Sequence, residues 1–371
     1  MKRARSLVVG PSPYIFHRQT TASFMWGTAA LLAPAVAWSV FCFGREAAFP
    51  LLCSIAAALL GEAAAGALSG RFSLRDGSAF LTGLLVGMAM PPGVPLYVPA
   101  AAALFAVVVV KGAFGGLGSN WMNPALGGIA FALLDWPRAM GTWKLPRQLA
   151  AADALSSATP LGLLRERLAT APAGSDTFTL LAAGGLHPSA FDRGVTEALN
   201  GGLFARLGAD LPSGYVDLIV GNRAGSLGEI SALLILAASI VLIARRMLRW
   251  EIPASILASF ALLQWSFGGL PLGNGFFAGD VLFSLLTGSI LLVAFFMAPD
   301  PVTSPSSSAA MIVYGSGVGL LTFLLRFFGS ATEGSAFAVI IMNCFVPFLD
   351  SRILPRRGAR SSRAAAAGRG A

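Results

Sequence analysis

The threonine at position 159 is the residue of this sequence best placed for chemistry. It ends the polar stretch Asp153-Ala154-Leu155-Ser156-Ser157-Ala158-Thr159 and is followed by Pro160. The next residues mix leucines with Arg165, Glu166 and Arg167, which predicts a short amphipathic helix with Thr159 as N-cap and proline at the first helical position. A phosphate attached to Thr159 would face the free N–H groups and positive dipole of that helix. The simpler interpretation is a capped helix in a loop.

A second candidate is the glycine-rich stretch from Lys111 to Gly128, which contains Asn120 and Asn123. Dense glycine allows helices to pack closely through small residues, and this is the simpler interpretation. Two amides and a lysine in an apolar region need polar partners, however. A flat heteroaromatic cofactor with ring carbonyls and nitrogens would provide them, so Lys111, Asn120 and Asn123 are candidate cofactor contacts.

Glu62 is a carboxylate inside an apolar run, which makes it a functional candidate. Three states are open to it: protonated, paired with a cation, or part of an ion path. We favour a structural pair, with Arg71 and Arg75 as the nearby cations. Glu229, near the start of a later run, is expected to lie in the first turn of a helix, where a carboxylate suits the helix dipole.

No soluble-enzyme signature accompanies these candidates. The sequence has no phosphate-loop pattern, dinucleotide fingerprint, zinc-protease motif or nucleophile elbow, so no catalytic residue is assigned. The cysteines lie inside apolar runs and the two histidines are isolated, so we expect neither a disulfide framework nor a metal site. Any chemistry must come from a bound cofactor.

The composition is that of a polytopic membrane protein. Of the 371 residues, 56% are hydrophobic and 12% are charged, about half of the charged fraction of a soluble domain. The net charge of +9 is explained by basic helix ends and tails rather than by a nucleic-acid partner. Ten apolar runs are candidate spans: Phe24–Phe43, Ala47–Leu68, Ser78–Met90, Pro95–Val110, Pro124–Trp136, Leu227–Ile243, Ile252–Phe267, Val281–Met297, Met311–Phe328 and Ala336–Leu349.

The order of these runs predicts two membrane halves around a polar loop. Most Lys and Arg residues fall on the side of the N-terminus, which predicts that both termini are cytoplasmic and the central loop extracytoplasmic. Leu81-Thr82-Gly83 and Leu286-Thr287-Gly288 occur in the third and eighth runs, and this indicates a five-plus-five inverted repeat. The expected organisation is a cytoplasmic tail at 1–23, a first half at 24–136, the loop at 137–225, a second half at 226–349 and a basic cytoplasmic tail at 350–371.

Several of these segments together resemble one family over nearly the whole chain. They are Pro11-Ser12-Pro13, Asp76 to Leu85, Lys111 to Pro124, Asp153 to Leu161, Gly225 to Ser231 and Phe295 to Pro305. They look like the RnfD subunit of the Rnf ion-translocating ferredoxin:NAD oxidoreductase, whose relative is the NqrB subunit of the sodium-pumping NADH:quinone reductase. The resemblance implies FMN bound as a phosphoester to Thr159 within a motif that includes Asp153, Ser156, Ser157 and Ala158. The family has glycine where this chain has Ser157.

What the resemblance implies is an electron relay rather than a self-contained catalyst. Expected partners are the other membrane and flavin subunits of an Rnf complex (A, B, C, E and G type), a flavin transferase and the bilayer of a bacterial inner membrane. The resemblance leaves open whether a noncovalent riboflavin is also bound. The first alternative function is that of an NqrB-type subunit of a sodium-pumping NADH:quinone reductase. From other classes, a urea-transporter-like channel would share the repeat, and a structural anchor would not explain polar residues at membrane depth.

Overall fold

The computed structural model describes residues 20–70, 73–147, 158–168, 172, 174–208, 210–329 and 334–353. The described chain folds into helices of very different lengths. Those before the central segment are α1 (Thr21–Phe43), α2 (Arg45–Ser69), η1 (Leu74–Asp76), α3 (Ser78–Met88), α4 (Tyr97–Leu104), η2 (Phe105–Gly112), α5 (Pro124–Asp135) and α6 (Pro137–Met140).

The remaining elements divide into a central group and a second apolar group. The central group comprises α7 (Pro160–Leu168), α8 (Thr177–Ala183), α9 (Ala190–Leu199), η3 (Asn200–Phe204), α10 (Ala205–Leu207) and α11 (Tyr215–Val220). The second apolar group comprises α12 (Ala232–Ala244), α13 (Glu251–Phe267), η4 (Leu270–Leu272), α14 (Val281–Leu286), α15 (Ile290–Leu292), η5 (Val293–Met297), α16 (Ser308–Phe328) and α17 (Ser335–Ile353).

The predicted all-helical polytopic membrane fold is confirmed. Within the described residues, five helices are long and apolar enough to cross a membrane: Thr21–Phe43, Arg45–Ser69, Glu251–Leu272, Ser308–Phe328 and Ser335–Ile353. Four shorter apolar helices accompany them: Ser78–Met88, Tyr97–Gly112, Pro124–Asp135 and Ala232–Ala244. The full number of spans, the boundaries of the two halves and the side on which each loop lies stay predictions.

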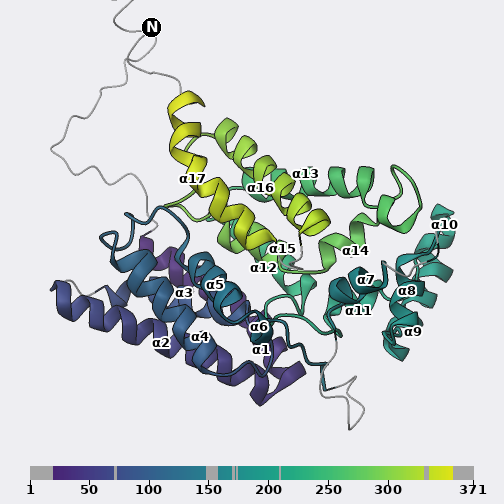
Figure 1. The fold of residues 1–371 in the computed structure, drawn as a ribbon, viewed down its shortest axis with the longest axis horizontal. Helices are drawn as coiled ribbons and strands as arrows, with labels where there is room; N and C mark the ends of the chain where they lie inside the picture. Colours follow the sequence, from purple (N-terminus) through teal and green to yellow (C-terminus); the bar gives the residue numbers. More distant parts are fainter. Residues whose placement is uncertain are drawn as a thin grey trace, which may run out of the picture.

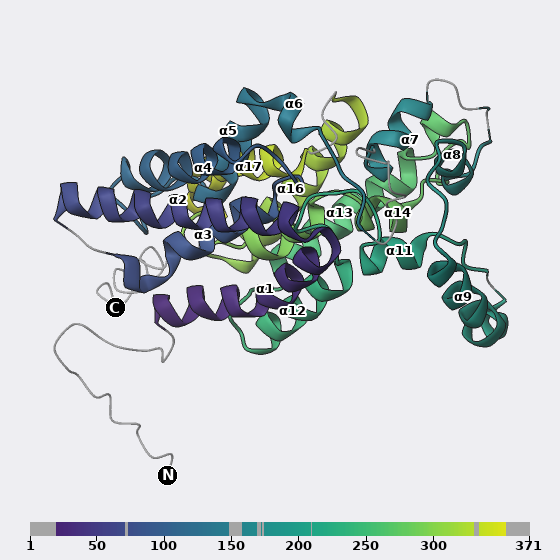
Figure 2. The same ribbon diagram turned by 90° about the horizontal axis from the view of Figure 1, so that it is seen from below.

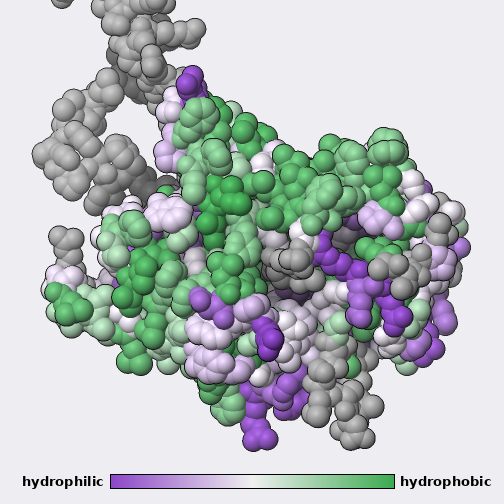
Figure 3. Space-filling model, viewed as in Figure 1, coloured by the Kyte–Doolittle hydropathy of each residue, from purple (hydrophilic) through white to green (hydrophobic). Residues whose placement is uncertain are grey.

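The central group gathers at one end of the molecule. Figures 1 and 2 both place α7 to α11 at the end remote from α2 and α3. Hydrophobic side chains cover the visible faces of both apolar groups, and hydrophilic side chains concentrate over the central group and in a lower central patch (Figure 3). Because hydrocarbon tolerates apolar side chains and excludes charged ones, the apolar groups are the part suited to the bilayer.

Small residues let the apolar helices approach closely. Gly83 and Gly87, one turn apart on α3, face α2: a Cβ added to Gly83 would lie 2.8 Å from Ser54 O, and one added to Gly87 would lie 3.1 Å from the Cα of Leu51. Association of membrane helices depends on such contacts, since lipid tails give no hydrophobic drive. These two glycines therefore allow α2 and α3 to pack closely against each other.

The run Val281–Met297 is helical but broken. α14 ends at Leu286, Thr287 is extended, Gly288 has φ +75°, and α15 and the π-helical η5 follow. Its counterpart in the predicted repeat differs locally, because Gly83 lies within the continuous helix α3. The five-plus-five repeat stays a prediction. The break matters because non-helical backbone inside a membrane protein is tolerated where it borders protein or a cavity.

Candidate functional site

Thr159 begins helix α7 as the sequence predicts. The N–H of Gly162 donates to Thr159 Oγ1 at 3.1 Å, and the N–H of Leu163 donates to the Thr159 carbonyl at 2.8 Å. Pro160 is the first helical residue, so the prediction of N-cap and first-turn proline is confirmed. Thr159 and Ala158 are half-buried. Asp153, Ser156 and Ser157 lie outside the described residues.

The surroundings of Thr159 bring together segments that are far apart in the sequence. Thr159 and Pro160 line a small cavity with Arg223 and Glu229 and with the break at Thr287 and Gly288. Arg223 is only 2% exposed, and its Nη2 donates to the backbone carbonyl of Glu229 at 3.1 Å. Thr159 therefore lies at a helix N-terminus and lines the same small cavity as Arg223, and a helix N-terminus and a guanidinium both favour an anion.

The segment that carries Glu229 lies between the two apolar groups. The N–H of Leu227 donates to Met90 O at 3.1 Å and that of Gly228 donates to Met88 O at 2.6 Å, which satisfies carbonyls at the end of α3. A Cβ on Gly228 would meet the Leu292 side chain at 2.6 Å. Gly228 is thus the point of close approach between α3 and α15, and it holds the next residue, Glu229, at the interface.

The expectation that Glu229 lies in the first turn of a helix is wrong. α12 begins at Ala232, and its N-cap is Ser231, whose Oγ accepts from the Leu234 N–H at 3.3 Å. Glu229 precedes that cap and is 7% exposed, with Oε1 accepting from Ser226 Oγ at 2.6 Å. Leu227 and Ile230 lie on either side of Glu229 within the predicted run, so hydropathy alone could not locate the true start of the helix.

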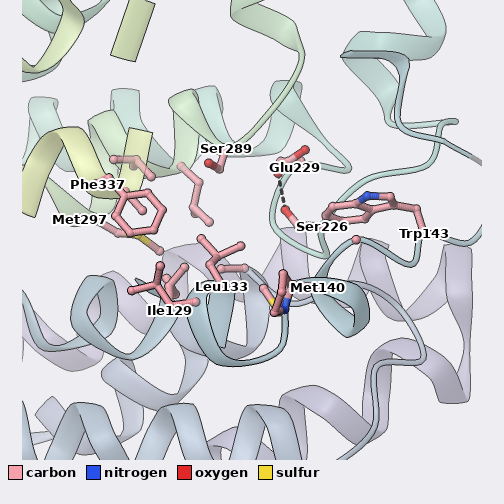
Figure 4. Close-up of a pocket in the computed structure, with 16 residues that line it drawn as sticks. Ile129, Leu133, Met140, Trp143, Ser226, Glu229, Ser289, Met297 and Phe337 are labelled. Carbon is pink, nitrogen blue, oxygen red and sulfur yellow. Dashed lines mark hydrogen bonds between the residues drawn. The ribbon is translucent and has the colours of Figure 1, made fainter. Parts of the chain in front are cut away.

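Glu229 also lines a cavity of about 390 Å³. We name it the interface cavity. Its walls come from α5, α6, the Ser226–Glu229 segment, α15, η5 and α17 (Figure 4). Apolar side chains such as Leu133 and Phe337 dominate, while Ser226, Glu229 and Ser289 add polar groups. A mostly apolar cavity with a few converging polar groups is the usual form of a small-molecule site.

Glu62 forms a buried ion pair, as the favoured interpretation holds, but not with Arg75. Lys111 rather than Arg75 provides the cation: its Nζ lies 2.8 Å from Glu62 Oε1 and donates to Ser78 Oγ at 2.7 Å. Arg71 lies outside the described residues. Lys111 is 2% exposed and Glu62 6%. Ser73 Oγ also donates to Glu62. The sequence predicted that Lys111 contacts a cofactor. In the structure its ammonium group contacts Glu62 and Ser78.

The two asparagines differ in how far the protein satisfies them. Asn123 Oδ1 caps α5 by accepting from the Ala125 N–H at 2.9 Å, and its Nδ2 donates to Met297 O at 2.9 Å, across the two apolar groups. Asn120 Nδ2 donates to Met122 O at 3.0 Å, while its Oδ1 is buried and has no hydrogen-bond partner among the described residues. Both line a cavity of about 60 Å³ together with Lys111. Of the two asparagines, Asn120 is therefore the one whose amide oxygen can accept a further hydrogen bond.

A further contact fastens the central group to α14. Tyr215 of α11 donates from its hydroxyl to Asp280, with distances of 2.9 and 2.8 Å to the two carboxylate oxygens. Asp280 precedes α14 as its N-cap, accepting from the Phe283 N–H at 2.9 Å. Burial raises the pKa of Asp280, nearby Asp176 adds to the rise, and the hydrogen bonds from Phe283, Tyr215 and Thr177 oppose it. Tyr215 therefore joins the central group to the helix that leads to the break at Thr287.

Because the pKa of Asp280 is raised, its contribution to stability should fall as pH rises. The contribution is complete below the pKa of Asp280 in the unfolded chain, about 4, and is lost as the pH rises through its pKa in the folded protein. Asp280→Asn keeps an acceptor for Phe283 and Tyr215 but cannot ionise. The melting temperature of the purified protein minus that of Asp280→Asn should thus decrease from about pH 4 upward and then level off. Exposed Glu197→Gln is the control; a difference that grows with pH would contradict the assignment.

Sequence reasoning missed the importance of Arg223 and Glu229. Arg223 was not singled out by the sequence, and Glu229 was expected to be a first-turn residue that suits the helix dipole. One signal was available: both flank Gly225-Ser226-Leu227-Gly228, where two glycines within four residues favour close backbone approach. Nothing in the sequence spacing shows that this segment meets Thr159, which lies more than sixty positions earlier.

Comparison with known proteins places the chain in one family. The NQR2, RnfD, RnfE family matches residues 8–358. The D subunit of the proton-translocating ferredoxin:NAD(+) oxidoreductase complex of Clostridium ljungdahlii is 32% identical over 348 residues, covering 94% of each chain. The D subunit of the ion-translocating oxidoreductase complex of Halorhodospira halophila is 35% identical, covering 87% of each chain. The D subunit of the Na(+)-translocating ferredoxin:NAD(+) oxidoreductase complex of Acetobacterium woodii is 30% identical, covering 93% of each. The resemblance stated from the sequence is confirmed: this chain belongs to the NQR2, RnfD, RnfE family.

Proposed function

We propose that the chain is the D-type membrane subunit of an ion-translocating ferredoxin:NAD oxidoreductase complex and carries FMN as a phosphoester on Thr159. The relatives that bear these complex names align over nearly the whole chain. The observation that supports the flavin is that Thr159 caps α7 and lines a small cavity with buried Arg223 and with Glu229, a residue that also lines the interface cavity. These groups fit a phosphoester and leave room nearby for a ring system.

The residues have separate tasks in this proposal. Thr159 provides the ester oxygen, and the N–H groups of the first turn of α7 face the phosphate. Arg223 balances its negative charge. When bound, FMN supplies one- and two-electron transfer chemistry that no side chain here offers. The protein holds the flavin at a fixed place between a donor and an acceptor in neighbouring subunits.

A denaturing gel viewed under ultraviolet light tests the attachment. The chain produced together with a flavin transferase should give a fluorescent band. Thr159→Asn should give none, because an amide forms no phosphoester, although it still caps α7 and keeps the fold. Thr179→Ala, a threonine of the same central group, should fluoresce like the wild type. A dark wild-type band, or fluorescence that persists in Thr159→Asn, would contradict the proposal.

The remaining parts of the proposal concern assembly and membrane position. We place the chain in a bacterial inner membrane with both ends cytoplasmic and the Thr159 segment outside, beside the other subunits of an Rnf-type complex. A reporter fused into the 137–225 segment that was active in the cytoplasm would contradict this orientation. Noncovalent riboflavin is part of the same proposal. After the protein is denatured and removed, analysis of the flavin left in solution tests it.

Glu62 is proposed to contribute to ion movement through its pair with Lys111. A carboxylate held by a lysine and a serine can change partners when the charge nearby changes. If ion transport by the assembled complex were unchanged in Glu62→Gln, this role would be wrong. The relatives are named for different coupling ions, a proton in one and Na⁺ in the other, and the coupling ion of this chain is left open.

A further inference from the structure

A pocket of about 110 Å³ lies where α7 meets the ends of two membrane-length helices, α13 and α16. Two arginines line it, Arg165 of α7 and Arg326 of α16, and the other described residues of its lining are uncharged. We name it the arginine pocket. Thr159 and Glu229 are not among the residues that line it. Both arginines are half-buried, so part of each side chain reaches the molecular surface.

The arginine pocket lies at the level where a membrane span ends. α13 and α16 run parallel: near their starts Ser308 Oγ donates to Glu251 Oε1 at 3.0 Å, and near their ends the ring centres of Phe267 and Phe323 are 6.2 Å apart. Arg326 follows in the last turn of α16. Basic side chains at the ends of spans reach toward the headgroup region of a bilayer. The pocket is therefore at the depth of lipid headgroups.

Helix α7 contributes one apolar face to the pocket. Leu161, Leu164 and Leu168, spaced by three and four positions, line it together with Arg165. Arg167, in the same turn of the helix, is exposed and is not part of the lining. Short helices with leucines on one face and charged residues on the other are suited to the plane of a membrane interface. This position of α7 agrees with the depth inferred from α13 and α16.

Arg326 is held at the wall of the pocket by protein groups. Its Nη1 donates to the Ser284 carbonyl at 2.9 Å, and its guanidinium carbon is 5.2 Å from the centre of the Phe260 ring. Ser284 and Phe260 also line the pocket. A guanidinium has five N–H groups in a planar fork, which matches the oxygens of a phosphate. Arg326 is thus a positioned charge rather than a freely moving surface side chain.

We propose that the arginine pocket binds the phosphate group of an anionic phospholipid between Arg165 and Arg326. Two like charges that line one pocket repel each other, so an anion that contacts both is favoured. The apolar walls, with Leu161, Leu164 and Phe260, suit the carbons next to the phosphate, which a free phosphate ion lacks. The pocket has room for the headgroup region alone, so the acyl chains would continue into the bilayer.

Lipid titration of the purified full chain tests this site. The chain is produced without a flavin transferase, so that no flavin phosphate is attached, and its melting temperature is measured in detergent with increasing short-chain phosphatidylglycerol. Bound lipid should raise the melting temperature. Arg165→Gln should raise the half-maximal lipid concentration about fivefold or more, because one of two charge-assisted contacts is lost. Arg167→Gln, on the same helix but outside the pocket, is the matched control and should titrate like the wild type.

Filling the pocket gives an independent readout that keeps both arginines. Leu164→Trp should also raise the half-maximal concentration about fivefold or more, because the larger side chain occupies the space of the headgroup. Leu262→Trp, at a 60% exposed position of α13 outside the pocket, should leave the titration unchanged. This arm holds even if Arg165→Gln does not fold.

The choice of ligand separates a lipid from other anions. Phosphatidylcholine of the same chain length should need about ten times the concentration or more, because its headgroup places a cation beside the two arginines. Inorganic phosphate at the same concentrations should leave the melting temperature unchanged. Equal titrations of the wild type, Arg165→Gln and Leu164→Trp would overturn the site. Equal effects of phosphatidylcholine would overturn the charge argument, and equal effects of inorganic phosphate would overturn the assignment to a lipid.

Discussion

Lys111→Met is expected to destabilise the protein by about 3–5 kcal/mol, because it leaves the carboxylate of Glu62 buried without its cation. The pair is almost fully enclosed, with 2% and 6% of the two side chains exposed and 2.8 Å between Lys111 Nζ and Glu62 Oε1. Ser73 would still donate to Glu62, but a hydroxyl cannot balance a full charge. Thermal unfolding of the purified protein in detergent measures the loss.

The double variant Glu62→Gln/Lys111→Met separates charge from packing. It removes both charges and keeps side chains of similar size, so it should recover most of the stability lost in Lys111→Met. Lys144→Met is the matched control. Lys144 forms a pair of similar length, 2.7 Å to Glu46 Oε1, but the side chains are 28% and 45% exposed. An exposed pair contributes only about 0–1 kcal/mol. Equal losses in Lys111→Met and Lys144→Met would contradict the argument from burial.

The sequence predicted features that depend on neighbouring residues. Thr159 before Pro160 was enough to predict the start of α7, since the cap uses groups within three positions. The apolar runs likewise predicted where the long helices lie, because burial in lipid requires a continuous apolar stretch. These inferences needed no knowledge of packing.

Features that depend on contacts between distant segments could not be predicted. Glu62 and Lys111 are 49 positions apart, and they meet only because α2 packs against η2. Arg75, closer in sequence, was the natural candidate. The break after Leu286 was hidden because Val281–Met297 is uncharged and mostly apolar, and only the Thr287-Gly288 pair indicated it. The approach of Thr159 to Arg223 and Glu229 likewise follows from the path of the central group.

Gly319→Ala is expected to destabilise the protein by about 1–3 kcal/mol, because α13 and α16 leave no room for a methyl group at that position. An added Cβ would lie 2.5 Å from the Ile256 carbonyl oxygen and 3.0 Å from the Phe260 nitrogen, and it would also collide with Ser259 Oγ. Backbone atoms cannot rotate away as a side chain can, so the helices must separate. Gly319→Leu should cost more than Gly319→Ala, and thermal unfolding in detergent measures both.

Gly317→Ala, two positions away on α16, distinguishes backbone contact from the general effect of replacing a helical glycine. The Cβ at Gly317 would meet only the end of the Met342 side chain, a flexible group that can move. Alanine is also the better helix former by about 1 kcal/mol, so Gly317→Ala should be neutral or stabilising. If Gly319→Ala proved as harmless as Gly317→Ala, the α13–α16 contact would have room for the added methyl group. In that case close packing through small residues would not be what joins these two helices.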